Sequence, residues 1–171
     1  MLAAVNPVAV ALLLWPRERA SVVAVAVGIA WAVVLAGAAA SEFLLDLLDV
    51  SEATFRLAAG VVLGLAGARW LLFGVSATDV DTPPGTWRRV GVPLLIPALI
   101  TPQLAMVAIS IGADDGVLVA AGTSALALAL AWLAMTLGKR RRLGWMVGAR
   151  FVGALGIAVA FSLVVDGVKT V

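Results

Sequence analysis

The sequence contains no cysteine, no histidine and no tyrosine, and only 13% of its 171 residues are charged. Without cysteine there can be no disulfide and no thiolate metal site. Without histidine there is no imidazole general base and no histidine zinc site. Because several enzyme classes lose their usual chemistry, we expect a protein that is not an enzyme and that needs no metal or cofactor.

Apolar residues make up 63% of the chain, and the mean hydropathy is +1.12. A typical globular domain is about 45–50% apolar and about 25% charged. A soluble core of this size could not cover so much apolar surface, whereas lipid solvates it. The composition predicts an all-α polytopic membrane protein. The net charge of +2 does not indicate a nucleic-acid partner, because the basic residues lie in short loops between apolar runs.

Six apolar segments follow one another along the chain, and a regular span needs about 20 residues. The first is too short for a full span, and the fourth is interrupted by Pro93, Pro97 and Pro102. An acidic stretch at residues 41–52 has leucines at helical spacing, which predicts an amphipathic helix at the membrane surface. The six segments are residues 1–15, 20–40, 53–75, 90–111, 117–137 and 146–165.

The charges of the loops alternate in sign, which predicts the orientation. Lysine and arginine mark the cytoplasmic side of a membrane protein. The odd-numbered loops are basic and the even-numbered loops are acidic, so we expect the basic loops to lie in the cytoplasm. The basic residues lie at 17, 19, 88, 89 and 139–142, and the acidic ones at 42, 46, 49, 52, 114 and 115.

Two pairs of features recur at nearly the same offset. Pro7 and Pro102 are 95 residues apart (102 minus 7), and Arg56 and Arg150 are 94 apart (150 minus 56). Chance matches in an apolar sequence are the alternative, but the offsets favour duplication of a three-helix unit. A second copy of three helices enters the membrane inverted, as in many secondary transporters. We therefore predict a first repeat at residues 1–75, a cytoplasmic linker at 76–89 and a second, inverted repeat at 90–171.

Asn6-Pro7 and Thr101-Pro102 are the candidate binding elements. Asparagine or threonine before proline is a favourable start for a helix, with proline as its first residue. Each pair predicts a helix N-terminus at membrane depth, whose free N–H groups and positive dipole suit a carboxylate. Gln103 adds an uncharged polar group beside the second break. The alternative is that the prolines only kink their helices.

Arg56 and Arg150 complete the candidate set. Each lies near the end of its segment, so one interpretation is that its side chain extends to the interface. The other is that it binds a substrate carboxylate or gates access to it. The small residues of the third and sixth segments, such as Gly60, Gly64 and Gly153, predict close helix packing and not a ligand site.

Four stretches of the chain together match the pattern of a known family. They are residues 4–12, 55–60 with 69–73, 92–97 with 101–102, and 149–153 with 166–167. In these stretches the chain resembles the MarC family of the LysE-type exporter superfamily. The resemblance implies six membrane helices in a bacterial plasma membrane and export of small neutral amino acids. The family's Gly-Pro-Gly at the second break reads Thr101-Pro102-Gln103 here, and only five residues precede Asn6.

The leading hypothesis is a transporter that exports small neutral amino acids or similar small solutes by alternating access, with one repeat rocking against the other. An ion or small-solute channel that uses the same broken helices is a second hypothesis. A non-transporting membrane subunit is a third. The expected partners are a small-molecule solute and the lipid bilayer, with homo-oligomerisation left open.

Overall fold

The computed structural model describes residues 1–6, 20–73, 99–137 and 142–170, and every regular element in these ranges is a helix. The prediction of an all-α protein is confirmed for this part of the chain. In chain order the helices are α1 (Leu2–Val5), α3 (Ala20–Ala39), α4 (Ser41–Leu48), α5 (Glu52–Phe73), α6 (Pro102–Asp114), α7 (Val117–Leu137) and α8 (Arg142–Thr170).

Four helices in the described ranges are long and apolar enough to cross a membrane: α3, α5, α7 and residues Met146–Thr170 of α8. Many of their large apolar side chains point outward, among them Leu65, Leu118 and Phe161. Apolar surface of this extent needs lipid around it and not water. The fold therefore indicates a multi-pass membrane protein, as the composition predicts.

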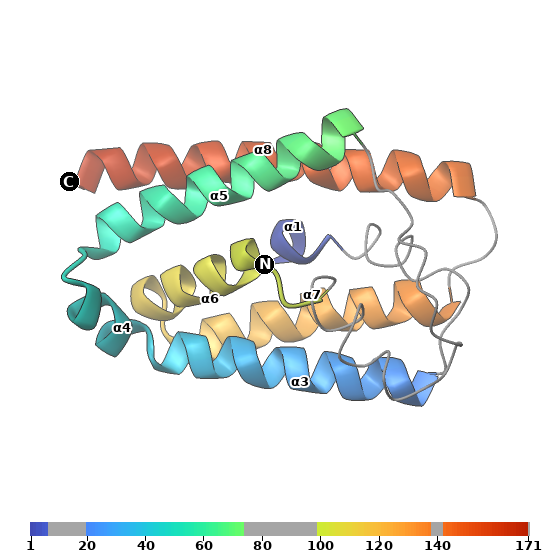
Figure 1. The fold of residues 1–171 in the computed structure, drawn as a ribbon, viewed down its shortest axis with the longest axis horizontal. Helices are drawn as coiled ribbons and strands as arrows, with labels where there is room; N and C mark the ends of the chain where they lie inside the picture. The colour runs from blue at the N-terminus through green and yellow to red at the C-terminus, as the bar shows by residue number, and fades with distance from the viewer. Residues whose placement is uncertain (7–19, 74–98, 138–141, 171) are drawn as a thin grey trace.

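The helices form two antiparallel pairs with two short helices between them (Figure 1). One pair is α5 with α8, the other is α3 with α7, and α1 and α6 lie between the pairs. At one end of the bundle, α3 and α6 end and α5 and α7 begin. We call this the acidic end, because it carries the acidic residues of α4, the start of α5 and the end of α6.

Glycines bring α5 and α8 into backbone contact. A Cβ atom added to Gly67 would lie 2.7 Å from the carbonyl oxygen of Gly153, and one added to Gly153 would lie 2.9 Å from that of Gly67. At Gly60 it would lie 2.9 Å from the Ala160 oxygen, and Gly167 makes a similar approach to the start of α5. The prediction that these small residues serve close helix packing is confirmed. The glycines of α5 pack on α8, and those of α8 pack on α5.

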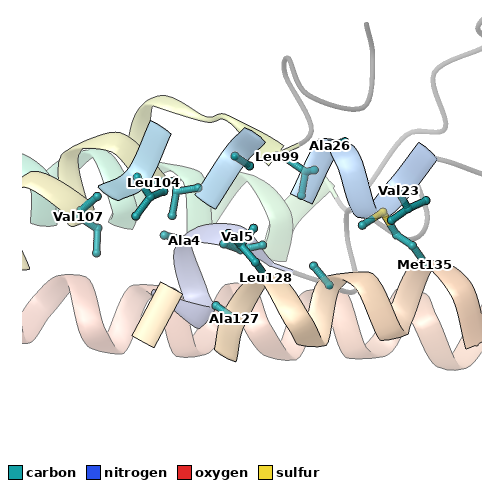
Figure 2. Close-up of a cluster of buried hydrophobic side chains, with 14 of the residues drawn as sticks. Ala4, Val5, Val23, Ala26, Leu99, Leu104, Val107, Ala127, Leu128 and Met135 are labelled. Atoms are coloured by element: carbon teal, nitrogen blue, oxygen red, sulfur yellow. The ribbon is translucent and has the colours of Figure 1, made fainter. Parts of the chain in front are cut away.

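A second buried cluster holds α1 and the start of α6 against α3 and α7 (Figure 2). Ala4 and Val5 of α1 are almost completely buried although α1 is only one turn long. The middle of the bundle is therefore filled by the two short helices. The labelled members of the cluster are Ala4, Val5, Val23, Ala26, Leu99, Leu104, Val107, Ala127, Leu128 and Met135.

α4 forms at the acidic stretch, as its leucine spacing predicts. It buries Leu45 and exposes Phe43, Leu47 and Leu48. Exposed apolar and acidic side chains on one short helix are what an interfacial helix presents to a membrane surface.

The turn before α7 is shorter than predicted. Residues 112–116 look like an acidic turn in the sequence, but α6 continues to Asp114 and only Asp115 and Gly116 separate it from α7. Gly112 is helical because it packs on the end of α3, where an added Cβ would lie 2.6 Å from the Ala38 oxygen. Gly112 was expected in a turn, but it lies within α6 and allows that helix to pack closely on α3.

Several predictions fall on residues outside the described ranges. They are the half-helix at residues 8–15 with Pro7, the linker at 76–89, the prolines Pro93 and Pro97, and the basic residues 17, 19, 88, 89 and 139–141.

Candidate functional site

The helices next to the two predicted helix breaks contact each other in the middle of the bundle. α1 ends at Val5 with Asn6 as its C-cap, and it contacts α6, which begins at Pro102 (Figure 1). Asn6 is completely buried, and Thr101 and Gln103 are 9% and 8% exposed. Polar residues at two helix ends, one from each half of the sequence, are thus buried among apolar helices.

Thr101 caps α6 as the sequence predicts. Its backbone is extended, with φ −113° and ψ 151°, and its Oγ1 accepts a hydrogen bond from the Leu104 N–H at 3.2 Å. Pro102 is the first residue of the helix. This arrangement is the N-cap device that threonine and proline favour.

The cap also limits how many donors α6 can offer to a ligand. A helix leaves its first N–H groups unused by its own backbone bonds. In the first turn of α6, Pro102 has no N–H and the Leu104 N–H is held by Thr101. Among residues 102–104, Gln103 therefore has the N–H that is neither missing nor bonded to the Thr101 cap. An anion at this end would meet one directed amide and the positive end of the helix dipole.

Asn6 has a different geometry from the predicted N-cap. It is the C-cap of α1, with a left-handed backbone at φ 42° and ψ 74°, and its N–H donates to the Leu2 oxygen at 3.0 Å. Its side-chain Nδ2 donates to the Ala149 oxygen of α8 at 3.2 Å. Asparagine tolerates the left-handed conformation that ends a helix. The helix that Asn6-Pro7 is predicted to begin lies outside the described residues.

A small cavity adjoins Thr101 between α3 and the first two turns of α6. Its volume is about 100 Å³, and Thr101 is its polar lining residue among apolar ones. Drug-sized ligands occupy roughly 300–1,000 Å³. The cavity therefore has room only for a few atoms of a small solute. The other lining residues are Ala30, Val33, Val34, Gly37, Ile100, Leu104, Ala105, Ala108 and Ile109.

Arg56 does not join this site. It forms a two-point ion pair with Asp114, in which Nε donates to Oδ2 at 2.8 Å and Nη2 contacts Oδ1. Ser110 donates a further hydrogen bond to the same carboxylate at 3.3 Å. Asp114 ends α6 and Thr101 begins it, so about 20 Å of helix separates Arg56 from the cap. Arg56 cannot bind the same solute group as Thr101 in this conformation.

Arg150 lies next to the residue that accepts the Asn6 hydrogen bond. It directly follows Ala149, whose carbonyl oxygen accepts the Asn6 amide, and its own side chain is exposed. The two arginines that mark the repeat therefore have different surroundings: one is paired with a carboxylate, and the other is open to its environment.

An open groove between α3 and α7 was not predicted from the sequence. Its volume is about 410 Å³, and Trp31 and Trp132 line it together with Gly28 and several alanines. The Trp31 indole donates to the Ala121 oxygen at 3.3 Å, while the buried Trp132 Nε1 has no partner among the described residues.

The fold defines the class as a multi-pass helical membrane protein in which the N-terminus of α6 is buried. No family model, curated protein or solved structure matches the chain. Within the described residues, no group of three or more acidic side chains lies close enough to hold a metal ion.

Thr101→Ala is expected to lower the free energy of unfolding by about 1 kcal/mol, because the Leu104 N–H loses its cap in a buried place. Thr101→Ser keeps the hydroxyl and should stay near the wild type. Thermal unfolding in detergent, followed by circular dichroism, measures both. Equal stability of the alanine and serine variants would show that the cap contributes nothing.

Proposed function

We propose that the chain is a secondary transporter that moves small neutral amino acids or similar small solutes out of a bacterial cell by alternating access. The observation that carries this proposal is the capped N-terminus of α6, which is buried in the middle of the bundle, where α6 contacts α1. Broken helices that point a terminus at the interior are how transporters bind a substrate carboxylate. The cavity of about 100 Å³ beside Thr101 suits a small solute.

The helix arrangement supports an inverted repeat. α3 and α7 begin 97 residues apart (117 minus 20) and end 98 apart (137 minus 39), close to the 94 and 95 of the sequence features. They pack antiparallel, as do α5 and α8 (Figure 1). Helices related by a two-fold axis in the membrane plane would have this relation. With residues 1–75 as one repeat and 90–171 as the other, six segments would cross or enter the membrane.

The resemblance to the MarC family supports the same function and suggests the substrate class. The positions it shares with this chain include Asn6-Pro7 and Pro102, at the two predicted helix breaks. The proposed orientation places the basic loops in the cytoplasm, so that the acidic end faces outward.

A non-transporting membrane subunit is the second candidate. The groove between α3 and α7 is larger than the cavity beside Thr101, and it exposes Gly28, at which an added Cβ would touch nothing within 4 Å. Small residues on an exposed membrane helix favour contact with another helix. Such a subunit would carry no solute.

Counterflow into proteoliposomes tests the proposed function. Vesicles loaded with unlabelled neutral amino acids should take up labelled alanine, glycine, serine or threonine, and uptake should saturate with concentration. A channel would instead pass solute without saturation or exchange. No uptake by folded, inserted protein would contradict amino-acid transport and leave the subunit as the better interpretation.

A further inference from the structure

The tightest interface in the bundle joins helices from the two proposed repeats. α5 belongs to the first repeat and α8 to the second, and their backbones touch at Gly60, Gly67 and Gly167. These contacts begin near the acidic end and extend beyond the middle of α5. A rocking of one repeat against the other, as expected from the sequence, would have to break this interface.

α6 is held to the other helix pair. Gly112 packs directly on the Ala38 backbone of α3, and Leu104 and Val107 of α6 belong to a buried cluster drawn mainly from α3 and α7, to which α5 and α8 add Leu63 and Ala160. α3 and α7 also contact each other along the bundle. α6 packs on α5 as well, but its contacts with α3 and α7 together are more extensive, so the helices divide into one unit of α5 and α8 and a second unit of α3, α6 and α7.

Between the two units at the acidic end lies the Arg56–Asp114 ion pair. Arg56 is on α5 and Asp114 on α6, and their side chains are 21% and 16% exposed. Both side chains are partly exposed at the end of the bundle, where the charges can separate without being left unpaired in a fully buried interior. A partly exposed ion pair can open and close. A helix interface packed closely through glycines does not separate as readily.

We propose that α5 and α8 move as one unit against α3, α6 and α7, and that the Arg56–Asp114 pair is the latch that closes the acidic end between them. Opening the latch would expose the α5–α6 interface that leads toward Thr101. Ser110, which donates to Asp114, holds the carboxylate in place for the guanidinium. The latch gives the proposed transporter its gate on that side and so rests on the proposed function.

Pulsed electron spin resonance distances test the two units and the latch without any substrate. The chain has no cysteine, so labelled cysteines can be introduced directly. One pair, Val61→Cys with Val168→Cys, spans α5 and α8, and a second pair, Val61→Cys with Ala39→Cys, spans the two units. All three positions are exposed.

In reconstituted protein, Arg56→Asp should add a longer distance between residues 61 and 39 and leave the distance between 61 and 168 unchanged. The exchange Arg56→Asp/Asp114→Arg restores opposite charges and should return the wild-type distance. Asp114→Asn, a milder change, should give a smaller population of the longer distance.

Three results would overturn the proposal: no change between residues 61 and 39 in Arg56→Asp, a parallel change between 61 and 168, or no rescue by the exchanged pair. These distances do not depend on transport. If the distances change as expected but no counterflow is found, the latch is supported and the transport function is contradicted.

Discussion

Gly67→Val is expected to force α5 away from α8 and to lower the amount of folded protein severely. The first added carbon would lie 2.7 Å from the Gly153 carbonyl oxygen and 3.1 Å from the Ile157 nitrogen. Both are backbone atoms, so no side chain can turn aside to make room. Overpacking of an interior costs about 1–3 kcal/mol where side chains can adjust, and here the helices themselves must move.

Gly28→Val is the matched control for this change. Gly28 also lies within a membrane-spanning helix, but nothing is within 4 Å of a Cβ added there. Both variants carry the same helix propensity change, so a difference between them reports packing alone. Yield of monodisperse protein and thermal unfolding in detergent should fall strongly for Gly67→Val only. Equal losses in the two variants would contradict the glycine interface.

Asn6→Val is the second change with a large expected effect. A β-branched residue in the left-handed conformation costs about 1–2 kcal/mol, and loss of the Nδ2 bond to Ala149 costs about 1 kcal/mol more. The melting temperature should fall by roughly 5–10 °C, at about 2–4 °C per kcal/mol for a chain of this length.

Asn6→Gly separates the two causes. Glycine adopts the left-handed backbone without strain but supplies no side-chain amide. It should therefore lose only the hydrogen-bond part, and its melting temperature should lie between those of the wild type and of Asn6→Val. Thermal unfolding of the three proteins gives the order. If glycine is as damaging as valine, the left-handed backbone is not what constrains this position.

Local patterns were predictable from the sequence because they depend on neighbouring residues. α7 was expected at residues 117–137 and is found as Val117–Leu137, since a run without charge or proline between turn residues has few alternatives. Thr101-Pro102 was expected to start a helix and does. Both follow from propensity and capping, which act within a few residues.

Contacts between distant segments could not be predicted in the same way. Arg56 and Asp114 are 58 residues apart, and the local sequence around either residue does not indicate that the other is its partner. Gly112 looked like a turn residue because its packing on Ala38 depends on how two helices approach. The C-cap role of Asn6 was not predicted, because asparagine favours both ends of a helix and the one-turn α1 before it was too short to recognise.

The measurement that tests the central claim most directly is amino-acid counterflow by Asn6→Ala/Thr101→Ala beside the wild type. Ser41→Ala is the control, because it removes a buried hydroxyl that bonds the Ala38 oxygen at the acidic end, away from the breaks. We expect saturable uptake by the wild type and by the control, and at least a tenfold loss in the double variant at equal amounts of folded protein. Wild-type uptake that the double variant retains in full would contradict a solute site at the paired helix breaks.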